Sequence, residues 1–377
     1  MKKRILTIIA ILIISIICLT SCSNALNNKT YFTTALNTGI TWQAQFTSDT
    51  STSDVDKIWS RVVSIINDYE NRFSTYEENS FVYKFNNADA GERIEGDLLD
   101  KQIFDLSKEI FEKTNGAFNP AVYMLSRLWG FADENSINNN LEAMTEQDIV
   151  IPSQSDINSA LSLTNFEDIV VEEENDVYYF TKPQNSTIIN GVEYSMQIDL
   201  SGILKGYIAG KIINEIHSSS AKWGYISLGS SSIAVLDKDE NGNYWNLTIK
   251  DPRNPSSAYL SIPMINTLLS TSGDYESYFE KDGVRYCHII NPFTGYPIQT
   301  GIMCASIMYN VSYNENEAIL GAYTDAYSTA IMVMNVEDAK SFIRTNNLQA
   351  TMCYKDGSKT KVFTTIKNSN LNNYEYC

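Results

Sequence analysis

The chain has only two histidines, and one of them, His288, lies between two glycine-marked turns. The surrounding stretch, Thr271 to Pro297, reads TSGDYESYFEKDGVRYCHIINPFTGYP. An imidazole titrates near neutral pH, so a His288 exposed in a cleft could act as a general base. A lone histidine in a strand-rich stretch is more often a hydrogen-bonded core residue. The stretch alone leaves both interpretations open.

A second candidate is the pair Asp325 and Thr329 in GAYTDAYSTAIMVM. These residues are four apart, so on a helix they share one face. Carboxylate and hydroxyl oxygens are hard ligands suited to Mg²⁺, which keeps waters and commonly bridges to substrate phosphates. The same spacing fits a helix-capping aspartate followed by an ordinary threonine, and spacing alone favours that simpler reading.

A third candidate is DLSGILKGYIAG, where Gly202, Gly206 and Gly210 recur at every fourth position. On a helix they form a bare stripe that lets another backbone or a flat ligand approach closely. Lys205 lies near the expected helix start, where amide groups and the helix dipole favour anions. Tight helix packing beside a solvated lysine explains the pattern as well. The motif is not a Walker P-loop, which requires Gly-x4-Gly-Lys-Ser/Thr.

A fourth candidate is NRFSTYEENS, where Ser74, Thr75 and Tyr76 follow an expected helix end. They could offer hydroxyls and an aromatic face to a ligand ring, or they could form a plain surface turn.

Periodicity predicts the elements that must position these residues. The expected helices cover about 54–73 (capped by Asp54 or Asp56), 98–116 ending at Gly116, one starting at Asp199 or Ser201, one starting near Ala322, and 336–346. The expected strands cover a first strand or hairpin in 31–46 and the stretches 170–200, 223–229, 231–237, 244–252, 258–273 and 285–292. Residues from about 132 to 165 read as an insertion with a short helix. Strands come in clusters, which favours an α+β fold.

The N-terminal segment predicts export. Lys2, Lys3 and Arg4 precede an apolar run that ends in LTSC, residues Leu19 to Cys22, and this ending resembles the lipobox of bacterial lipoproteins. We therefore expect a signal peptide over 1–21, a lipid on Cys22 and an extracytoplasmic, lipid-anchored protein. A transmembrane anchor is the alternative, because the run approaches the length of a span.

Charge and cysteine content narrow the function classes. The net charge of −17 becomes −20 when the three basic N-terminal residues are removed, which argues against nucleic acid or anionic lipid as the main partner. Beyond Cys18 and Cys22, the cysteines are Cys287, Cys304, Cys353 and Cys377. They show no zinc-ligand spacing and no disulfide framework, although a single disulfide stays open.

Taken together and in order, the candidate segments resemble the ApbE family, the FAD:protein FMN transferases. The family pattern includes F-S-x-Y, G-A-F-D-P-T, D-L-G-G-I-A-K-G-Y, L-G-G-N, S-G-x-Y followed by H-I-I-D-P-x-T-G, and A-D-A-x-x-T. The chain reads FSTYEENS, GAFNPAVYMLSRLWGF, DLSGILKGY, LGSS, SGDYESYFEKDGVRYCHIINPFTG and TDAYST in the same order. The match extends over about residues 31–345.

The resemblance implies an ApbE-like, T-fold-related α+β domain over 31–365, made of mixed or antiparallel sheets packed with helices, as one large domain or two intimately packed lobes. Residues 22–30 would form a polar tether and 366–377 a polar tail. The implied activity is Mg²⁺-dependent cleavage of FAD and transfer of FMN to a Thr or Ser hydroxyl of an extracytoplasmic redox protein.

The resemblance also implies roles for individual residues. Asp325, Thr329 and the carbonyl of Gly202 take the metal-ligand places, and His288 takes the place of the base that deprotonates the acceptor hydroxyl. The positions implied to contact FAD are Leu36, Ser74, Thr75, Tyr76, Asn119, Lys205, His288 and Ile290.

Three departures from the pattern bear on function. Asn119 and Ala121 replace the family Asp and Thr, Asn291 replaces the Asp of H-I-I-D-P, and Ser230 and Ser231 replace Gly and Asn. The alternatives are therefore an FAD pyrophosphatase that releases FMN and AMP, and a flavin-binding lipoprotein without turnover.

Overall fold

The computed structural model describes residues 27–35, 38–47, 49–132, 149–229, 231–313, 316–366 and 370–371. The predicted signal peptide, Cys22, Leu36, Ser230 and Cys377 lie outside these ranges. Within them, no helix combines the length and the apolar character needed to cross a membrane.

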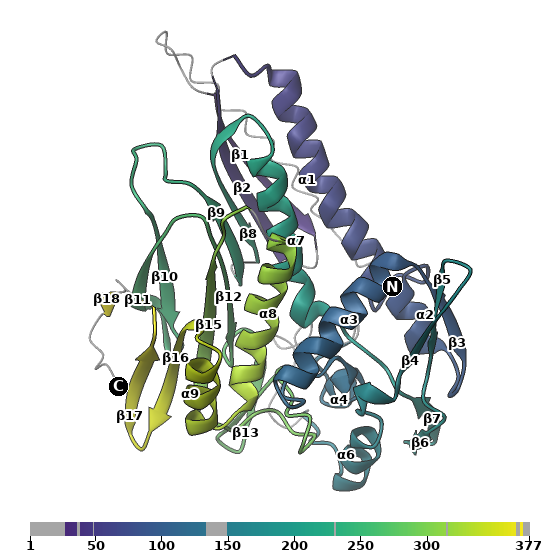
Figure 1. The fold of residues 1–377 in the computed structure, drawn as a ribbon. Helices are drawn as coiled ribbons and strands as arrows, with labels where there is room; N and C mark the ends of the chain where they lie inside the picture. The colour runs from purple at the N-terminus through teal and green to yellow at the C-terminus, as the bar shows by residue number, and fades with distance from the viewer. Residues whose placement is uncertain are drawn as a thin grey trace, which may run out of the picture.

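An eight-stranded antiparallel sheet forms the centre of the fold (Figure 1). Its order is β1-β2-β8-β9-β12-β15-β16-β17. The strands are β1 (Asn27–Ala35), β2 (Thr38–Phe46), β8 (Ala221–Leu228), β9 (Ser232–Leu236), β12 (Thr267–Gly273), β15 (Ile302–Asn310), β16 (Gln349–Asp356) and β17 (Lys359–Thr364). The predicted α+β class is confirmed. The three strands β15, β16 and β17 were not predicted.

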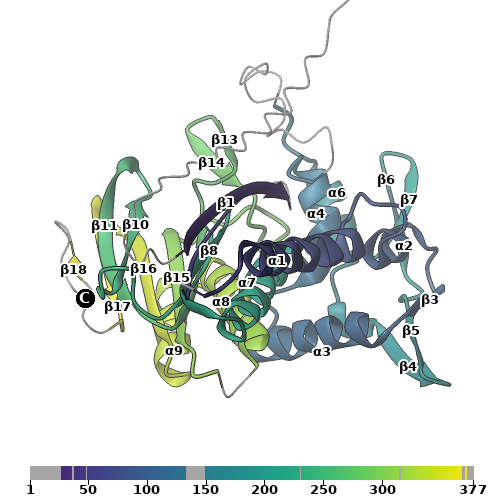
Figure 2. The same ribbon diagram turned by 90° about the horizontal axis from the view of Figure 1, so that it is seen from above.

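Two central helices, α7 (Ser201–His217) and α8 (Glu317–Val333), cover one face of this sheet (Figures 1 and 2). Both are apolar almost all round, as expected for helices buried between layers. Helix α1 (Thr52–Phe73) packs on α7, and α3 (Leu98–Lys113) packs on α8. A large apolar core fills the space between the helices and the sheet.

The opposite face of the large sheet is covered by a small sheet of order β10-β11-β18. Its strands are β10 (Trp245–Asp251), β11 (Asn254–Met264) and β18 (Asn370–Leu371). The stretch 258–273, predicted as strand throughout, therefore contains parts of two strands in different sheets. They are separated by Asn266, which has a positive φ of 45°, a backbone conformation that asparagine adopts more readily than most residues.

The remaining elements are short helices and strands, among them the hairpin of β13 and β14 that leads into His288. They are α2 (Phe81–Asn87), β3 (Arg93–Gly96), η1 (Pro120–Val122), α4 (Tyr123–Leu128), α6 (Gln154–Leu161), η3 (Phe166–Asp168), β4 (Val170–Glu174), β5 (Val177–Thr181), β6 (Ser186–Ile189), β7 (Val192–Ser195), β13 (Tyr278–Lys281) and β14 (Val284–Cys287). Helix α9 (Val336–Thr345) lies near the end of the chain. The four short strands within 170–200 match the prediction of antiparallel strands joined by turns.

Several predicted boundaries differ from the structure. Helix α1 begins two residues before the expected start and is capped by Ser51, whose side chain accepts a hydrogen bond from the Asp54 amide, so Asp54 belongs to the first turn. Helix α8 begins at Glu317, five residues before Ala322, and its first residues include the good helix formers Glu317, Ala318 and Leu320. At the chain ends, β1 begins at Asn27, inside the predicted tether, and β18 lies inside the predicted tail.

Candidate active site

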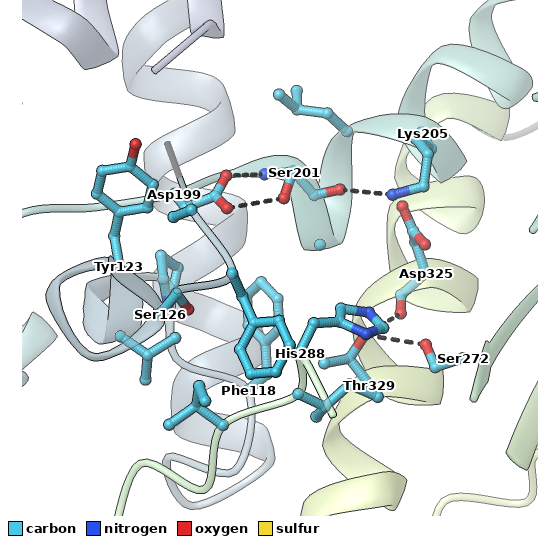
Figure 3. Close-up of a pocket in the computed structure, with 18 of the residues that line it drawn as sticks. Phe118, Tyr123, Ser126, Asp199, Ser201, Lys205, Ser272, His288, Asp325 and Thr329 are labelled. Atoms are coloured by element: carbon cyan, nitrogen blue, oxygen red, sulfur yellow. Dashed lines mark hydrogen bonds between the residues drawn. The ribbon is translucent and has the colours of Figure 1, made fainter. Parts of the chain in front are cut away.

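A cavity of about 520 Å³ opens where α1, η1, α7, α8 and the β14 loop meet. Volumes of this size are typical of small-molecule sites. Ten predicted site residues line it: Ser74, Thr75, Tyr76, Asn119, Gly202, Lys205, His288, Ile290, Asp325 and Thr329. Figure 3 shows Lys205, His288, Asp325 and Thr329 turned toward the same space from three segments. The fold therefore brings together residues more than 250 positions apart in the chain.

The crossing of α7 and α8 explains two of the three stripe glycines. A Cβ atom at Gly206 would lie 2.0 Å from the carbonyl oxygen of Gly321, and one at Gly210 would lie 2.1 Å from the carbonyl oxygen of Glu317. These two positions serve helix packing. Gly202, in contrast, would meet only a Phe118 ring carbon at 3.4 Å and lines the cavity. The glycine stripe therefore serves both interpretations that the sequence left open: Gly206 and Gly210 allow close helix packing, and Gly202 lines the ligand cavity.

This close crossing fixes the Asp325 carboxylate. The Gly206 amide donates a hydrogen bond to Asp325 Oδ2 at 3.0 Å, and Ser232 Oγ lies 3.5 Å from Oδ1. Asp325 is only 4% exposed. Burial raises the pKa of this carboxyl above its ordinary value, although nearby Lys205 opposes the shift. An anionic Asp325 in this position would therefore be strongly stabilised by a bound cation.

A row of hydroxyls continues from Asp325 along α8. Thr329 Oγ1 lies 3.0 Å from Ser272 Oγ and 3.3 Å from the Asp325 carbonyl oxygen. Ser272 and Ser270 are two apart on β12 and face α8, and Ser270 Oγ lies 2.8 Å from Thr324 Oγ1. The sequence prediction missed both serines. The signal was the period-2 spacing in LLSTSG, which places alternate residues on one face of a strand.

Lys205 lies one turn into α7, and its Nζ donates to the carbonyl oxygen of Ser201 at 3.2 Å. The start of this helix is held by Asp199, whose carboxylate accepts from the Ser201 amide at 2.8 Å and from Ser201 Oγ at 2.9 Å. Asp199 thus fixes the first turn from outside the helix. Lys205 therefore places a cation at the cavity, which favours a phosphate group there, whereas the helix N-terminus itself is occupied by the Asp199 carboxylate.

His288 directly follows β14, which ends at Cys287 and not in the Asn291–Pro292 region as predicted. Its amide donates to the Ser277 carbonyl oxygen at 2.9 Å, and its Nδ1 lies 3.2 Å from the same oxygen. Because a carbonyl oxygen only accepts, this contact requires the proton on Nδ1 and leaves a lone pair on Nε2. Burial lowers the pKa of His288 below its ordinary value, and the Lys205 charge acts in the same direction. The ring is therefore neutral at pH 7, as a general base must be.

The predicted flavin-contact residues lie on the rim and wall of the cavity. Ser74 caps α1, and its Oγ accepts from the amides of Tyr76 and Glu77 at 3.1 Å and 3.2 Å. Tyr76, which lines the cavity, is 42% exposed. An exposed aromatic ring at the mouth of a cavity can stack on a planar ligand. Their contact with FAD stays a prediction, as does that of Leu36.

The departures from the family pattern differ in their structural effect. Asn119 Oδ1 caps η1 through the Ala121 amide at 2.9 Å, while its Nδ2 donates to the Thr164 carbonyl oxygen at 2.9 Å. An aspartate could make only the first contact, so the asparagine gains a hydrogen bond at the cavity wall. Asn291 Oδ1 accepts from the Phe293 and Thr294 amides at 2.9 Å and 3.2 Å, a turn that an aspartate makes equally well.

Other cavity-lining residues were not predicted. Phe118, Tyr123 and Ser126 project into the site from the segment around η1 and α4 (Figure 3). They lie within GAFNPAVYMLSRLWGF, so their motif was recognised although their side chains were not singled out. Phe118 is buried and forms part of the cavity wall.

Within the described part of the chain, no group of three or more His, Cys, Asp or Glu side chains could hold a metal ion. The predicted ligands Asp325, Thr329 and Gly202 supply one carboxylate, one hydroxyl and one backbone carbonyl, so they do not form a cluster of this type. Cys287, Cys304 and Cys353 are buried free thiols, and Cys304 lies opposite Cys353 across β15 and β16.

Curated proteins similar to this chain include several FAD:protein FMN transferases. The FAD:protein FMN transferase of Escherichia coli K12 is 27% identical over 293 residues, which cover 77% of this chain and 74% of that protein. The FAD:protein FMN transferase of Haemophilus influenzae is 24% identical over 352 residues, which cover 92% of each chain.

Solved structures show the same fold. The apo flavinyl transferase ApbE of Pseudomonas stutzeri superposes with a TM-score of 0.72 at 20% identity, covering 90% of this chain and 95% of that one. The ApbE protein of Thermotoga maritima gives a TM-score of 0.68 at 26% identity, covering 89% and 96%. The family model described as ApbE family matches residues 38–352. This match spans most of the sequence, so the chain belongs to the ApbE family.

Proposed function

We propose that this enzyme is a Mg²⁺-dependent FAD:protein FMN transferase. It cleaves the pyrophosphate of FAD, attaches FMN through a phosphoester bond to a Thr or Ser hydroxyl of another protein, and releases AMP. The observation that carries the proposal is the meeting of His288, Lys205 and Asp325 at one cavity. The names of the relatives support the same activity.

The donor set fits Mg²⁺. The Asp325 carboxylate, the Thr329 hydroxyl and the Gly202 carbonyl are hard oxygen ligands that line one cavity. A single carboxylate leaves positions for phosphate oxygens and water, which Mg²⁺ usually retains. When bound, Mg²⁺ would neutralise charge on the diphosphate and stabilise the departing AMP.

The chain's own residues supply the binding of the diphosphate. Lys205 offers a cation beside the start of α7, where Asp199 accepts hydrogen bonds from the amide and hydroxyl of Ser201. This local cation opposes the formal charge of −17 that would otherwise repel a dinucleotide. Phosphoryl transfer depends mostly on such placement and charge neutralisation.

His288 supplies the base. Its Nε2 lone pair takes the proton of the acceptor hydroxyl as the hydroxyl oxygen bonds to the FMN phosphorus. The bond from that phosphorus to the bridging oxygen breaks, and AMP leaves with the electron pair. The Nδ1 contact to Ser277 holds the ring in the tautomer that this step needs.

We also propose a cellular location for the enzyme. The LTSC ending after an apolar run supports a lipid on Cys22 and an extracytoplasmic, membrane-anchored enzyme. Radiolabelled palmitate should enter the full-length chain, and Cys22→Ala should abolish the labelling. Label that stays in Cys22→Ala would refute a lipid at this residue.

The activity is tested by incubating the purified enzyme with FAD, Mg²⁺ and a candidate acceptor protein, followed by intact-mass analysis. Acceptor gaining the mass of one FMN, with equimolar AMP, is the expected result. Release of free FMN and AMP without acceptor modification would assign a pyrophosphatase. FAD that binds and stays intact would assign a flavin-binding lipoprotein. A His288→Ala variant serves as the control for acceptor activation.

A further inference from the structure

A charged cluster outside the cavity wall connects to the loop that holds His288. Arg253 follows β10 and forms a two-pronged ion pair with Asp274, with Nη1–Oδ1 at 2.7 Å and Nη2–Oδ2 at 2.6 Å. The Asp274 side chain is 14% exposed and that of Arg253 is 32% exposed. Paired N–H···O bonds of this kind fix orientation as well as distance. Within 251–254, Asp251 Oδ1 accepts from the Arg253 amide at 2.8 Å, which sets the turn that presents the guanidinium.

Asp274 also connects to both flanks of the His288 hairpin. Its amide donates to the Met303 carbonyl oxygen of β15 at 3.0 Å. Arg285 of β14, the strand that leads into His288, places Nη1 4.0 Å from Asp274 Oδ1. The same guanidinium stacks on Tyr278 at 3.8 Å from the ring centroid and pairs with Glu280. One carboxylate thus links the β10–β11 turn, the loop after β12 and strand β14.

This loop sets the histidine ring. Ser277 lies three residues after Asp274, and its carbonyl oxygen receives both the amide and Nδ1 of His288. Tyr275 lies between Asp274 and Ser277 in the sequence. Its ring packs so closely on Gly273 that a Cβ atom at Gly273 would lie 2.4 Å from a ring carbon. The contacts of Gly273, Asp274 and Tyr275 therefore restrain the segment that leads to the Ser277 carbonyl.

We infer that Asp274, clamped by Arg253, is a positioning residue that holds the Ser277 carbonyl and thereby keeps His288 in the Nδ1–H tautomer with Nε2 free toward the acceptor hydroxyl. The ApbE pattern S-G-x-Y leaves position 274 unspecified, so this device is read from the structure of this chain. The catalytic part of the inference rests on the proposed function, whereas the tautomer part does not.

The first test is spectroscopic. The chain contains only two histidines, so ¹⁵N-histidine labelling of the full-length chain gives two imidazoles, and His288→Ala identifies the signals of His288. At about pH 8, above the ordinary histidine pKa, wild-type His288 should show the Nδ1–H tautomer. Asp274→Asn and Arg253→Gln should give a mixture of the two tautomers. Arg253→Lys keeps a cation but cannot make the two-pronged ion pair, so its tautomer populations should lie between those of the wild type and of Arg253→Gln.

The second test is kinetic. We expect Asp274→Asn to reduce the rate of FMN transfer by about tenfold to a hundredfold, because small misplacement of a catalytic group has effects of this size, with unchanged affinity for FAD. In a His288→Ala background the same substitution should change the rate less than about twofold. The matched control is Glu174→Gln, which breaks the exposed pair with Arg93 on the β3-β5-β4 sheet, away from the cavity. It should leave both the tautomer and the rate at wild-type values.

The outcomes separate the inference from the proposed function. Wild-type tautomer populations and transfer rates in both Asp274→Asn and Arg253→Gln would overturn the inference, and so would an Nε2–H tautomer in the wild type. If the variants show the expected tautomer shift but the wild type transfers no FMN, the proposed function is refuted while the positioning role of Asp274 is supported.

Discussion

Replacing Gly206 with alanine tests how closely α7 and α8 must approach each other. The new Cβ atom would lie 2.0 Å from the Gly321 carbonyl oxygen and 2.8 Å from Asp325 Cβ. A carbon and a carbonyl oxygen in close backbone contact normally stay about 3.3 Å apart. The two helices would therefore have to separate locally by about 1.3 Å, the difference between ~3.3 and 2.0 Å. The obstructing atoms belong to the backbone, so no side-chain rotation can relieve the overlap.

The expected cost follows from two opposing effects. Inserting a methyl group into a packed interior typically costs about 1–3 kcal/mol, and alanine in place of helical glycine gains about 1 kcal/mol. Because backbone is crowded here, we expect a cost at or above the upper end and a net loss of about 2 kcal/mol in the free energy of unfolding. The same separation moves Asp325 away from the Gly206 amide that binds it at 3.0 Å. FAD turnover should therefore fall together with stability.

Urea unfolding of the full-length chain measures the effect, and Gly202→Ala is the matched control. A Cβ at Gly202 meets one Phe118 ring carbon at 3.4 Å, an ordinary contact. The control should be neutral or up to about 1 kcal/mol more stable than the wild type. If Gly206→Ala unfolds at the same urea concentration as the wild type, the helix crossing is looser than described and the account of the stripe is wrong.

Three further predictions follow. Asp325→Ala should reduce turnover roughly a hundredfold or more while reducing FAD affinity much less, because the metal charge matters most as the bond breaks; full activity with Mg²⁺ would remove Asp325 from the metal site. The lowered pKa of His288 predicts that FMN transfer rises with pH through a midpoint below 6.5 and then levels off, since only the neutral ring accepts a proton; a midpoint above 6.5 in the pH–rate profile would contradict this. Burial lowers the pKa of Lys182 to about 8. Between about pH 8 and about pH 10.5 the folded state therefore binds fewer protons than the unfolded state, so the free energy of unfolding of the wild type rises with pH in this range. Lys182→Met should therefore be about 1–2 kcal/mol more stable than the wild type at pH 7, since the Ala88 carbonyl keeps its Ser195 hydroxyl partner at 3.1 Å. This advantage should shrink toward about pH 10, where the wild-type lysine is neutral. Lower stability of the variant at pH 7 in urea unfolding would refute the prediction.

Much of the fold could be predicted where the pattern is local. Helices α1, α3 and α9 and the short strands of 170–200 have clear periodicity, polar caps and glycine or asparagine turns, and these signals act over a few residues. Strands β15 to β17 were missed although they complete the large sheet. The residues of β15 and β16 are buried on both faces over much of their length, so the alternation that marks a half-buried strand is absent there.

The residue types and their order in the sequence determined the family resemblance and the candidate site, since His288, Lys205, Asp325 and Thr329 stand in recognisable motifs. Their meeting was decided by the tertiary structure alone. Only the crossing at Gly206 places an α7 amide against Asp325, and only the loop after β12 supplies the Ser277 carbonyl that selects the tautomer of His288. The physical reason is that sequence patterns report which face of an element is apolar, whereas contacts between elements distant in the chain depend on how those faces pack.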